Sequence, residues 1–377
     1  MIYFDNASST KPFLKTVEIY KEECLNSYAN PNSIHALGMH NMTRINRIKA
    51  NILKLFKLDS KYEVIFTSGA TESNNLAILG YCRKNKNKGK HIITSKIEHE
   101  SVLNVFAKLE GEGFKVDYLN VDSTGNINLD ELKDKIDNDT ILVALMSSNN
   151  EVGSVLDIKK SKEIISKFPK CVFYSDVAQA VGKVDINYSL IDMFGFSMHK
   201  IHGLKGSGLL IKKKNISLEP IIFGGGQENG LRSGTLDFPI IVSTNYTLEE
   251  VMNNVIKNNR HVKEISDYLK KELGNSDEIE VNNINATNPY IVSISLKNKL
   301  ASVVVEALSN KEIYVNSVSA CNSKNDGPSY VLLAMGMDQK RAKNVIRISL
   351  SEENTLDEAI IFVKELNEIL STIKGVK

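Results

Sequence analysis

Cysteine is scarce in this sequence, and its few cysteines are widely separated. The 377 residues contain four of them, Cys24, Cys82, Cys171 and Cys321. Four thiols in a chain of this length do not form a disulfide framework, and none are paired at the short spacing of zinc-binding motifs. This cysteine usage favours a reducing compartment, and we expect the protein in the cytoplasm.

Long apolar segments and an excess of charge of one sign are also missing. No apolar segment approaches the roughly 20 residues that span a bilayer. The first residues, 1–5, lack the basic and apolar regions of a signal peptide. The formal net charge is only +2, which gives no electrostatic reason for a nucleic acid or an anionic membrane to bind. We therefore expect neither partner.

The remaining composition is that of an ordinary globular enzyme, with 42% hydrophobic and 24% charged residues. Between residues 63 and 176, short apolar strand patterns alternate with helical patterns. This alternation predicts an α/β fold in which helices cover both faces of a mainly parallel sheet, giving three layers.

The length exceeds the size at which a single core usually stops growing, so two domains are expected. A long helix predicted over residues 242–273 would connect them. We assign residues 14–255 to the large domain. Residues 1–13 and 256–377 form a smaller α+β domain that carries Cys321.

Polar residues follow several of the expected strands. The carboxyl ends of parallel strands meet at one edge of a sheet, where ligands bind in such folds. The sequence therefore predicts that these polar residues share one site. They are Thr71, His99, Asn150, Asp176 and Lys200.

Lys200 follows an apolar strand predicted at residues 191–195. A lysine at a buried strand end is costly unless it is paired or neutral. Burial lowers a lysine pKa, and a neutral amine can form a Schiff base. Ser197 and His199 beside it could hold a phosphate. We hypothesise that Lys200 carries pyridoxal phosphate, although from this residue alone a lysine that reaches from the strand end to water is the better interpretation.

Asp176 and its neighbours suit the other polar groups of such a cofactor. A buried carboxylate needs a cation, and a pyridinium nitrogen would be one, keeping the ring an electron sink. A salt bridge to lysine or arginine is an equally good alternative. Gln179 and Asn150 could reach the ring oxygen, although each alone is more often a loop hydrogen-bonding residue.

Two further strand-to-helix junctions allow two interpretations each. Residues 68–71 would aim backbone amides at a phosphate, but a plain helix start capped by Thr71 is the better interpretation of this segment alone. His99 could stack on a flat ring and move protons, or it could simply cap a helix.

The C-terminal region offers a thiol and a guanidinium. Cys321 lies in a small, polar, glycine-containing segment that predicts an exposed loop. A cysteine there is a candidate nucleophile or an incidental exposed thiol. Arg347 interrupts an apolar strand, where it could clamp a carboxylate with two hydrogen bonds or face water from an edge strand.

Together these segments resemble the cysteine desulfurases of the NifS/IscS type, within the class V aminotransferase family of fold-type I pyridoxal-phosphate enzymes. The resemblance runs nearly end to end. The motifs that carry it lie at residues 3–7, 30–31, 66–74, 98–99, 149–153, 176, 179, 199–200, 224–228, 232–235 and 319–321.

The resemblance implies pyridoxal 5'-phosphate as cofactor and gives roles to individual residues. Lys200 would bind the cofactor and later take the Cα proton of the substrate. Cys321 would accept the sulfur as a persulfide, His99 would assist proton transfers, and Arg347 would bind the substrate carboxylate. Thr235 would reach the cofactor phosphate of a second subunit, which implies a homodimer. The implied cofactor-binding residues are Ala70, Thr71, His99, Asn150, Asp176, Gln179, Ser197, His199, Lys200 and Thr235, and Asn150 would also contact the substrate.

The implied activity is conversion of L-cysteine to L-alanine, with sulfur passed to an acceptor or scaffold protein for iron–sulfur cluster assembly or thiolation. No metal site is implied beyond a transient contact of an iron–sulfur cluster with Cys321. Met198 stands where the family commonly has glycine and would crowd the phosphate turn, and Leu204 replaces a usual proline. The alternatives are a selenocysteine lyase, another class V lyase or aminotransferase, and, of a different class, a non-catalytic sulfur-transfer scaffold.

Overall fold

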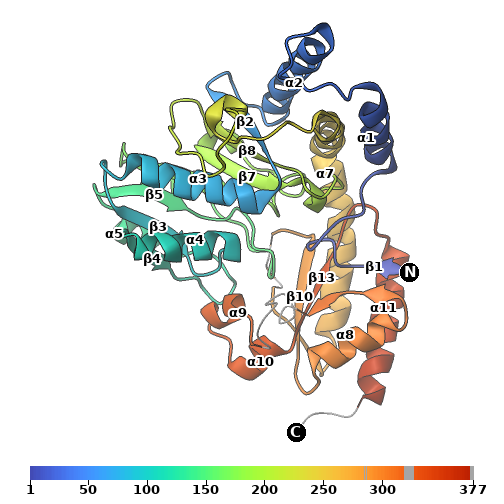
Figure 1. Cartoon of the computed structure of the whole chain (residues 1–377). Coiled ribbons are helices and arrows are strands. Elements are labelled where there is room, and N and C mark those ends of the chain that lie inside the picture. The colour runs from blue at the N-terminus through green and yellow to red at the C-terminus, as the bar shows by residue number, and fades with distance from the viewer. Residues whose placement is uncertain (284, 286, 318–326, 374–377) are drawn as a thin grey trace.

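The computed structural model describes residues 1–283, 285, 287–317 and 327–373. Figure 1 shows a region built on a large sheet and a smaller region below it, with helix α7 (Phe238–Gly274) running through both. This helix confirms the one predicted over residues 242–273. None of the described helices has the length and apolar composition needed to cross a membrane.

The large sheet contains β2 (Tyr62–Thr67), β3 (His91–Ser95), β4 (Lys115–Leu119), β5 (Thr140–Ala144), β6 (Val172–Asp176), β7 (Met193–Ser197) and β8 (Gly208–Lys213). In the described part of the chain its order is β2-β8-β7-β6-β5-β3-β4. The pairs from β7 to β4 are parallel, whereas β8 runs antiparallel to β2 and β7. The mainly parallel sheet is therefore confirmed.

Side-chain alternation along the strands gives this sheet two apolar faces. On β7, Phe194 and Phe196 point into one core and Met193 into the other. The first core also contains side chains of α2 (Ala36–Leu55), α5 (Leu129–Lys135), α6 (Ile158–Ile165) and α7. The second contains side chains of α3 (Ala70–Asn85) and α4 (Glu100–Gly111). Helices on both faces make the three layers that were predicted.

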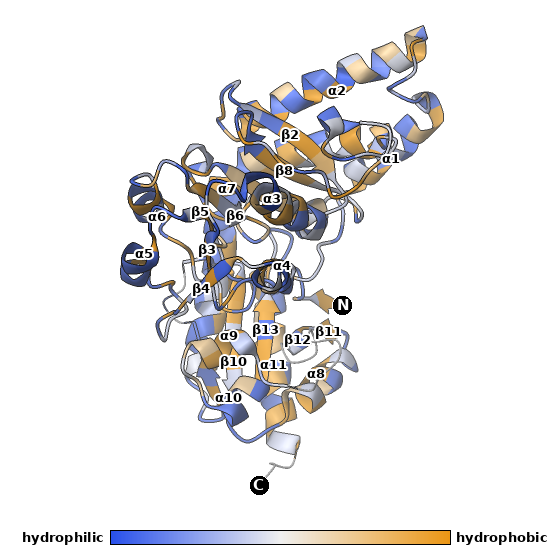
Figure 2. Ribbon diagram, turned by 60° about the vertical axis from the view of Figure 1, so that its left-hand side comes forward, coloured by the Kyte–Doolittle hydropathy of each residue, from blue (hydrophilic) through white to orange (hydrophobic). Residues whose placement is uncertain are grey.

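The smaller region has its own core around an antiparallel sheet. Its strands are β9 (Ile279–Val281), β10 (Ile291–Leu296), β12 (Asn316–Ser317) and β13 (Val345–Ser349), in the order β12-β13-β10-β9. Helices α8 (Ala301–Ser309) and α11 (Leu356–Thr372) and the second half of α7 contribute to its core. Figure 2 shows the hydrophobic colouring of β10 and β13 inside this region.

The N-terminus joins this smaller region, because β1 (Ile2–Tyr3) pairs in parallel with β11 (Ile313–Tyr314). Phe4 is fully buried in the same core as α11. The boundaries at residues 13–14 and 255–256 stay predictions. The remaining helices are α1 (Leu14–Asn26), α9 (Tyr330–Ala334) and α10 (Gln339–Lys343).

Candidate active site

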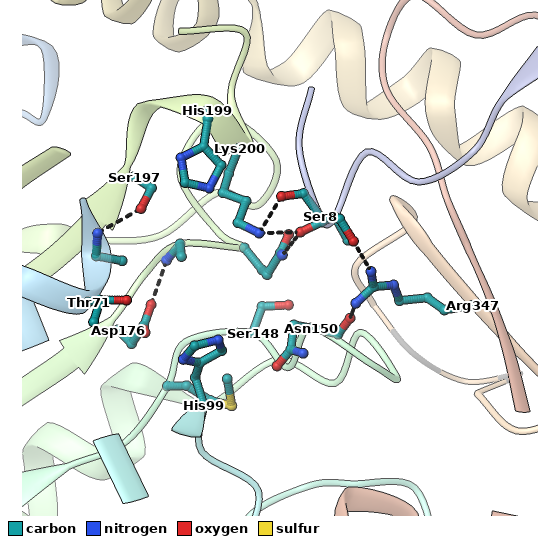
Figure 3. Close-up of a pocket in the computed structure, with 15 residues that line it drawn as sticks. Ser8, Thr71, His99, Ser148, Asn150, Asp176, Ser197, His199, Lys200 and Arg347 are labelled. Atoms are coloured by element: carbon teal, nitrogen blue, oxygen red, sulfur yellow. Dashed lines mark hydrogen bonds between the residues drawn. The ribbon is translucent and has the colours of Figure 1, made fainter. Parts of the chain in front are cut away.

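A cavity of about 280 Å³ lies at the carboxyl end of the large sheet. Figure 3 shows polar side chains that converge on it from the sheet edge, from the N-terminal segment and from β13. All five residues that were predicted to share one site line this cavity, which confirms that they meet. They are Thr71, His99, Asn150, Asp176 and Lys200.

Lys200 reaches the cavity from a short 3-10 turn (Met198–Lys200) that directly follows β7. The side chain is half-buried. Its Nζ donates to the backbone oxygens of Ala7 and Ser8, at 2.6 and 2.8 Å. The N-terminal segment therefore holds the amine at the cavity wall. The alternative, in which the side chain of Lys200 extends from the strand end into water, is wrong.

Asp176 is the last residue of β6 and is buried. Its Oδ1 accepts from the Ala178 N–H at 2.9 Å, and its Oδ2 accepts from Asn74 Nδ2 at 2.8 Å. Both donors are uncharged, so they orient the carboxylate without neutralising it. The carboxylate can pair with a cationic group of a ligand in the cavity.

The first turn of α3 meets the end of β7 at one corner of the cavity. The Ala70 N–H donates to Ser197 Oγ at 2.6 Å. The N-cap of α3 is Gly69, without a side-chain cap, so the alternative in which Thr71 caps this helix is wrong. A helix N-terminus beside a serine hydroxyl suits an anionic group such as a phosphate.

His199 lies in the wall beside this corner and is neutral at neutral pH. Burial lowers the pKa of its imidazole to about 4, and the positive charges of Lys200, Lys205 and Lys183 act in the same direction. Its Nδ1 is buried without a hydrogen-bond partner among the described residues. A neutral imidazole can donate one hydrogen bond to a bound anion.

Two more wall residues carry buried polar atoms that lack partners among the described residues, Asn150 Oδ1 and Arg347 Nε. Buried polar atoms normally have partners, so this wall fits a polar ligand. An anion-binding corner, a buried carboxylate and a lysine amine are the donor set that pyridoxal phosphate requires. The residues present fit the cofactor.

The helix-capping interpretation of His99 is confirmed, while its stacking and proton-transfer role stays a prediction. His99 is the N-cap of α4, where its Nδ1 accepts from the Ser101 N–H at 3.1 Å. Its side chain also lines the cavity opposite Lys200 in Figure 3. The capping bond fixes the ring, so that it presents a flat face and one further nitrogen to the site.

Arg347 enters the cavity from β13, which lies between β10 and β12. Its side chain is 4% exposed, so the alternative of an edge-strand arginine that faces water is wrong. Nη2 donates to Asp5 Oδ1 at 3.0 Å and to Ser8 Oγ at 2.7 Å. Nη1 donates to the backbone oxygen of Asn150 at 3.1 Å. The guanidinium is thus held in a fixed orientation.

Four other predicted features have different outcomes. Gln179 lines the cavity and donates from Nε2 to the Ala7 oxygen at 3.0 Å. Thr235 is exposed and does not line the cavity of its own chain. Met198 is fully buried in the apolar core, so the prediction that it crowds the phosphate turn is wrong. Cys321 lies outside the described residues, and its role stays a prediction.

Sequence reasoning missed several residues of the site. Asp5 and Ser8 hold Arg347, Asn74 orients Asp176, and Lys183 donates to Gln179 Oε1 at 2.9 Å. Lys183 follows Gln179 by four residues, within the turn that comes after β6. That spacing is the signal that could have found Lys183.

The fold and the cavity together define the class: a fold-type I enzyme of the pyridoxal-phosphate-dependent kind. The family pattern described as aminotransferase class V matches residues 2–362, and the chain belongs to this family.

Individual relatives are similar over nearly the whole chain. A NifS/IcsS protein homolog of Lactobacillus delbrueckii subsp. bulgaricus is 36% identical over 374 residues, covering 98% of this chain and 97% of that protein. Cysteine desulfurase IscS of Methanosarcina thermophila is 35% identical over 385 residues, covering 99% and 93%. A solved NifS-like protein superimposes with a TM-score of 0.92 at 33% identity, covering 99% of this chain and 100% of that one.

A solved structure titled SspA in complex with cysteine superimposes with a TM-score of 0.82 at 31% identity, and the match covers 94% of this chain and 100% of that one. Membership of the class V family implies an enzyme that depends on pyridoxal phosphate.

Proposed function

We propose that the protein is a cysteine desulfurase that uses pyridoxal 5'-phosphate to convert L-cysteine to L-alanine. The observation that carries this proposal is the convergence of Lys200, Asp176, His99 and Arg347 on one cavity. Relatives of matching length named cysteine desulfurase support the choice of L-cysteine as substrate.

The cofactor, when bound, supplies an electron sink that stabilises negative charge on the Cα of an amino acid. Lys200 would attach it and later move the Cα proton through Nζ. Asp176 would pair with the ring nitrogen. Thr71 and the Ala70 amide, with Ser197 and His199, would hold the phosphate, and Gln179 and Asn150 would meet the ring oxygen.

The other side of the cavity would bind the amino acid. The Arg347 guanidinium, oriented by Asp5 and Ser8, would pair with the substrate carboxylate. Asn150 lies beside it, and His99 would exchange protons with the substrate. Cys321 would take up the sulfur as a persulfide and present it to an acceptor or scaffold protein for iron–sulfur cluster assembly or thiolation.

We also propose a homodimer in which Thr235 of one subunit reaches the phosphate site of the other. Thr235 is exposed and lies outside the cavity of its own chain. Large apolar side chains on and between α1 and α2 are exposed as well, including Tyr28 at 78% and Ile34 at 94%. Their exposure favours a protein partner at this end of the molecule. A solution mass equal to one chain would contradict the dimer.

The reducing compartment stays our prediction from the cysteine usage.

The decisive experiment measures alanine and sulfide from L-cysteine, with reductant present, for the wild type and for Cys321→Ala. We expect the variant to keep the colour of the bound cofactor and to lose both products. The control is Cys24→Ala, because Cys24 is exposed on α1 and has no proposed role.

Equal activity of Cys321→Ala and the wild type would overturn the persulfide mechanism and leave a lyase, for which selenocysteine is the next substrate to assay. A wild type that never acquires colour with added cofactor would favour a non-catalytic scaffold.

A further inference from the structure

Lys183 is a buried lysine next to the site that none of the proposed steps uses. It is 5% exposed. The chain reaches it through Gly182, whose φ of +72° is a left-handed conformation. A Cβ on Gly182 would lie 2.0 Å from Val251 Cγ1 of α7, so only glycine fits there. The Lys183 oxygen also accepts from Asn259 Nδ2 of α7 at 2.7 Å. The backbone of Lys183 is therefore fixed against α7.

The Lys183 ammonium specifies which way the Gln179 amide points. Nζ donates to Gln179 Oε1 at 2.9 Å. Lys183 is protonated below its pKa of about 7, and in that form it can only donate, so the atom facing it must be the amide oxygen. On its other side the amide meets the backbone oxygen of Ala7, which can only accept, at 3.0 Å from Nε2. Both neighbours demand the same orientation, and a second N–H of Gln179 remains available in the cavity wall.

The charges around Lys183 come from three places. Lys200 on the turn after β7 and Arg347 on β13 are cations, and Glu352 after β13 is a carboxylate that is paired with His202. Burial first, and then the Lys200 charge, lower the pKa of Lys183 to about 7, while Glu352 opposes this. Burying a lysine among these charges costs folding free energy, and this cost favours a role in the site over a purely structural one.

We propose that Lys183 is a positioning residue: it holds the Gln179 amide so that an N–H, and not the carbonyl, faces the ring oxygen of the cofactor. This inference rests on the proposed function, since that function supplies the ring oxygen. The oriented N–H stabilises negative charge on this oxygen and so lowers the proton affinity of the bound chromophore.

The test is a pH titration of the visible absorption band of the reconstituted protein, followed without substrate. The variants are Lys183→Met, Gln179→Ala and the double variant. We expect Lys183→Met to raise the titration midpoint by about one pH unit, the tenfold change that loss of one charge-assisted hydrogen bond can bring. In the Gln179→Ala background the same substitution should shift the midpoint by less than about 0.3 units, since residues that act through one another are not additive.

Lys270→Met is the matched control, because Lys270 is also largely buried, has a pKa that burial lowers, and does not line the cavity. It should leave the midpoint unchanged. If Lys183→Met does not fold, as judged by circular dichroism, Lys183→Gln is used in its place. The glutamine keeps a donor toward Gln179. It should then give a smaller shift than Gln179→Ala.

Two outcomes would overturn the inference while leaving the proposed function intact. One is an unchanged midpoint in Lys183→Met. The other is an equal shift with and without Gln179, which would mean that Lys183 acts by charge alone. A wild type that acquires no visible band with pyridoxal phosphate would instead remove the proposed function, and this inference with it.

Discussion

The cavity has two walls that are built in different ways. The sheet wall consists of Asp176, Ser197 and Lys200, which lie within 25 residues of one another at the ends of β6 and β7. The terminal wall joins Asp5 to Arg347 across 342 positions of sequence. In the proposed function, the sheet wall carries the groups for the cofactor, and the terminal wall carries the groups for the substrate carboxylate. The difference teaches that the groups proposed for the cofactor come from neighbouring strand ends, whereas those proposed for the substrate come together only when the two ends of the chain are joined.

Two carboxyl groups that lie behind the walls, outside the cavity lining, also differ. On the sheet side, burial raises the pKa of Glu98 to about 8, and the charge of Asp176 adds to this. On the terminal side, burial also acts to raise the pKa of Glu352, but the hydrogen bond and charge of His202 outweigh it and leave the pKa below its usual value. At neutral pH, Glu98 is therefore mainly protonated and Glu352 ionised.

The largest effect is expected from the sheet wall. Lys200→Ala removes the amine that would hold the cofactor and move the Cα proton, so alanine formation from L-cysteine should fall by a factor on the order of 10²–10⁴ or more. The assay is alanine release at saturating cysteine. Lys205→Ala is the control, because Lys205 is an exposed lysine in the same loop. Turnover of Lys200→Ala close to that of the wild type would remove the functional contrast between the walls.

The terminal wall should respond in substrate affinity rather than in turnover. Arg347→Lys keeps the positive charge but loses the planar fork that contacts Asp5, Ser8 and Asn150. We expect KM for L-cysteine to rise about tenfold or more, corresponding to about 1.4 kcal/mol, with kcat nearly unchanged. Steady-state kinetics measure both constants.

The matched control is Arg341→Lys, whose ion pair with Glu280 at 2.8 Å lies outside the cavity. A fall in kcat with constant KM in Arg347→Lys would mean that the terminal wall acts on the chemical step, and the division of roles between the walls would then be wrong.

The sheet wall could be predicted from the sequence because its rules are local. Strand ends in a parallel sheet meet at one edge, so residues such as Thr71, Asp176 and Lys200 were expected together before any contact was known. The same reasoning gave the three layers, since apolar strands and amphipathic helices alternate over more than a hundred residues.

The terminal wall could not be predicted because its contacts are non-local. Asp5 reaches Arg347 because the N-terminal segment lies beside β13, where Asp5 forms a single bridge with Ser349. The neighbouring pairings, of β1 with β11 and of β12 with β13, involve strands of two residues. Strands this short show no periodicity. Asn74, on α3, and Lys183, in the turn after β6, escaped notice because polar side chains are normally exposed. Only the structure shows that their partners are Asp176 and Gln179.

For Glu98 the expected effect is on stability rather than on activity, and it depends on pH. Glu98 Oε1 accepts from Ser95 Oγ at 2.7 Å and from the Met146 N–H at 2.9 Å. Because its pKa rises from 4.5 to about 8 on folding, the native state holds a proton that the unfolded state releases between these values. Its contribution to stability is therefore present below pH 4.5 and is lost progressively as the pH rises to 8.

Glu98→Gln replaces this group by a neutral one of the same shape. The free energy of unfolding of the variant, relative to that of the wild type, should therefore increase by up to about 1.4 kcal/mol for each pH unit between pH 4.5 and 8. Urea unfolding of the cofactor-free protein at pH 6, 7 and 8 measures the difference. Glu100→Gln, an exposed neighbour in the first turn of α4, should show no such trend. A constant difference between Glu98→Gln and the wild type would mean that Glu98 stays ionised in the fold. Glu98 would then resemble Glu352, and the electrostatic contrast between the two sides of the site would be lost.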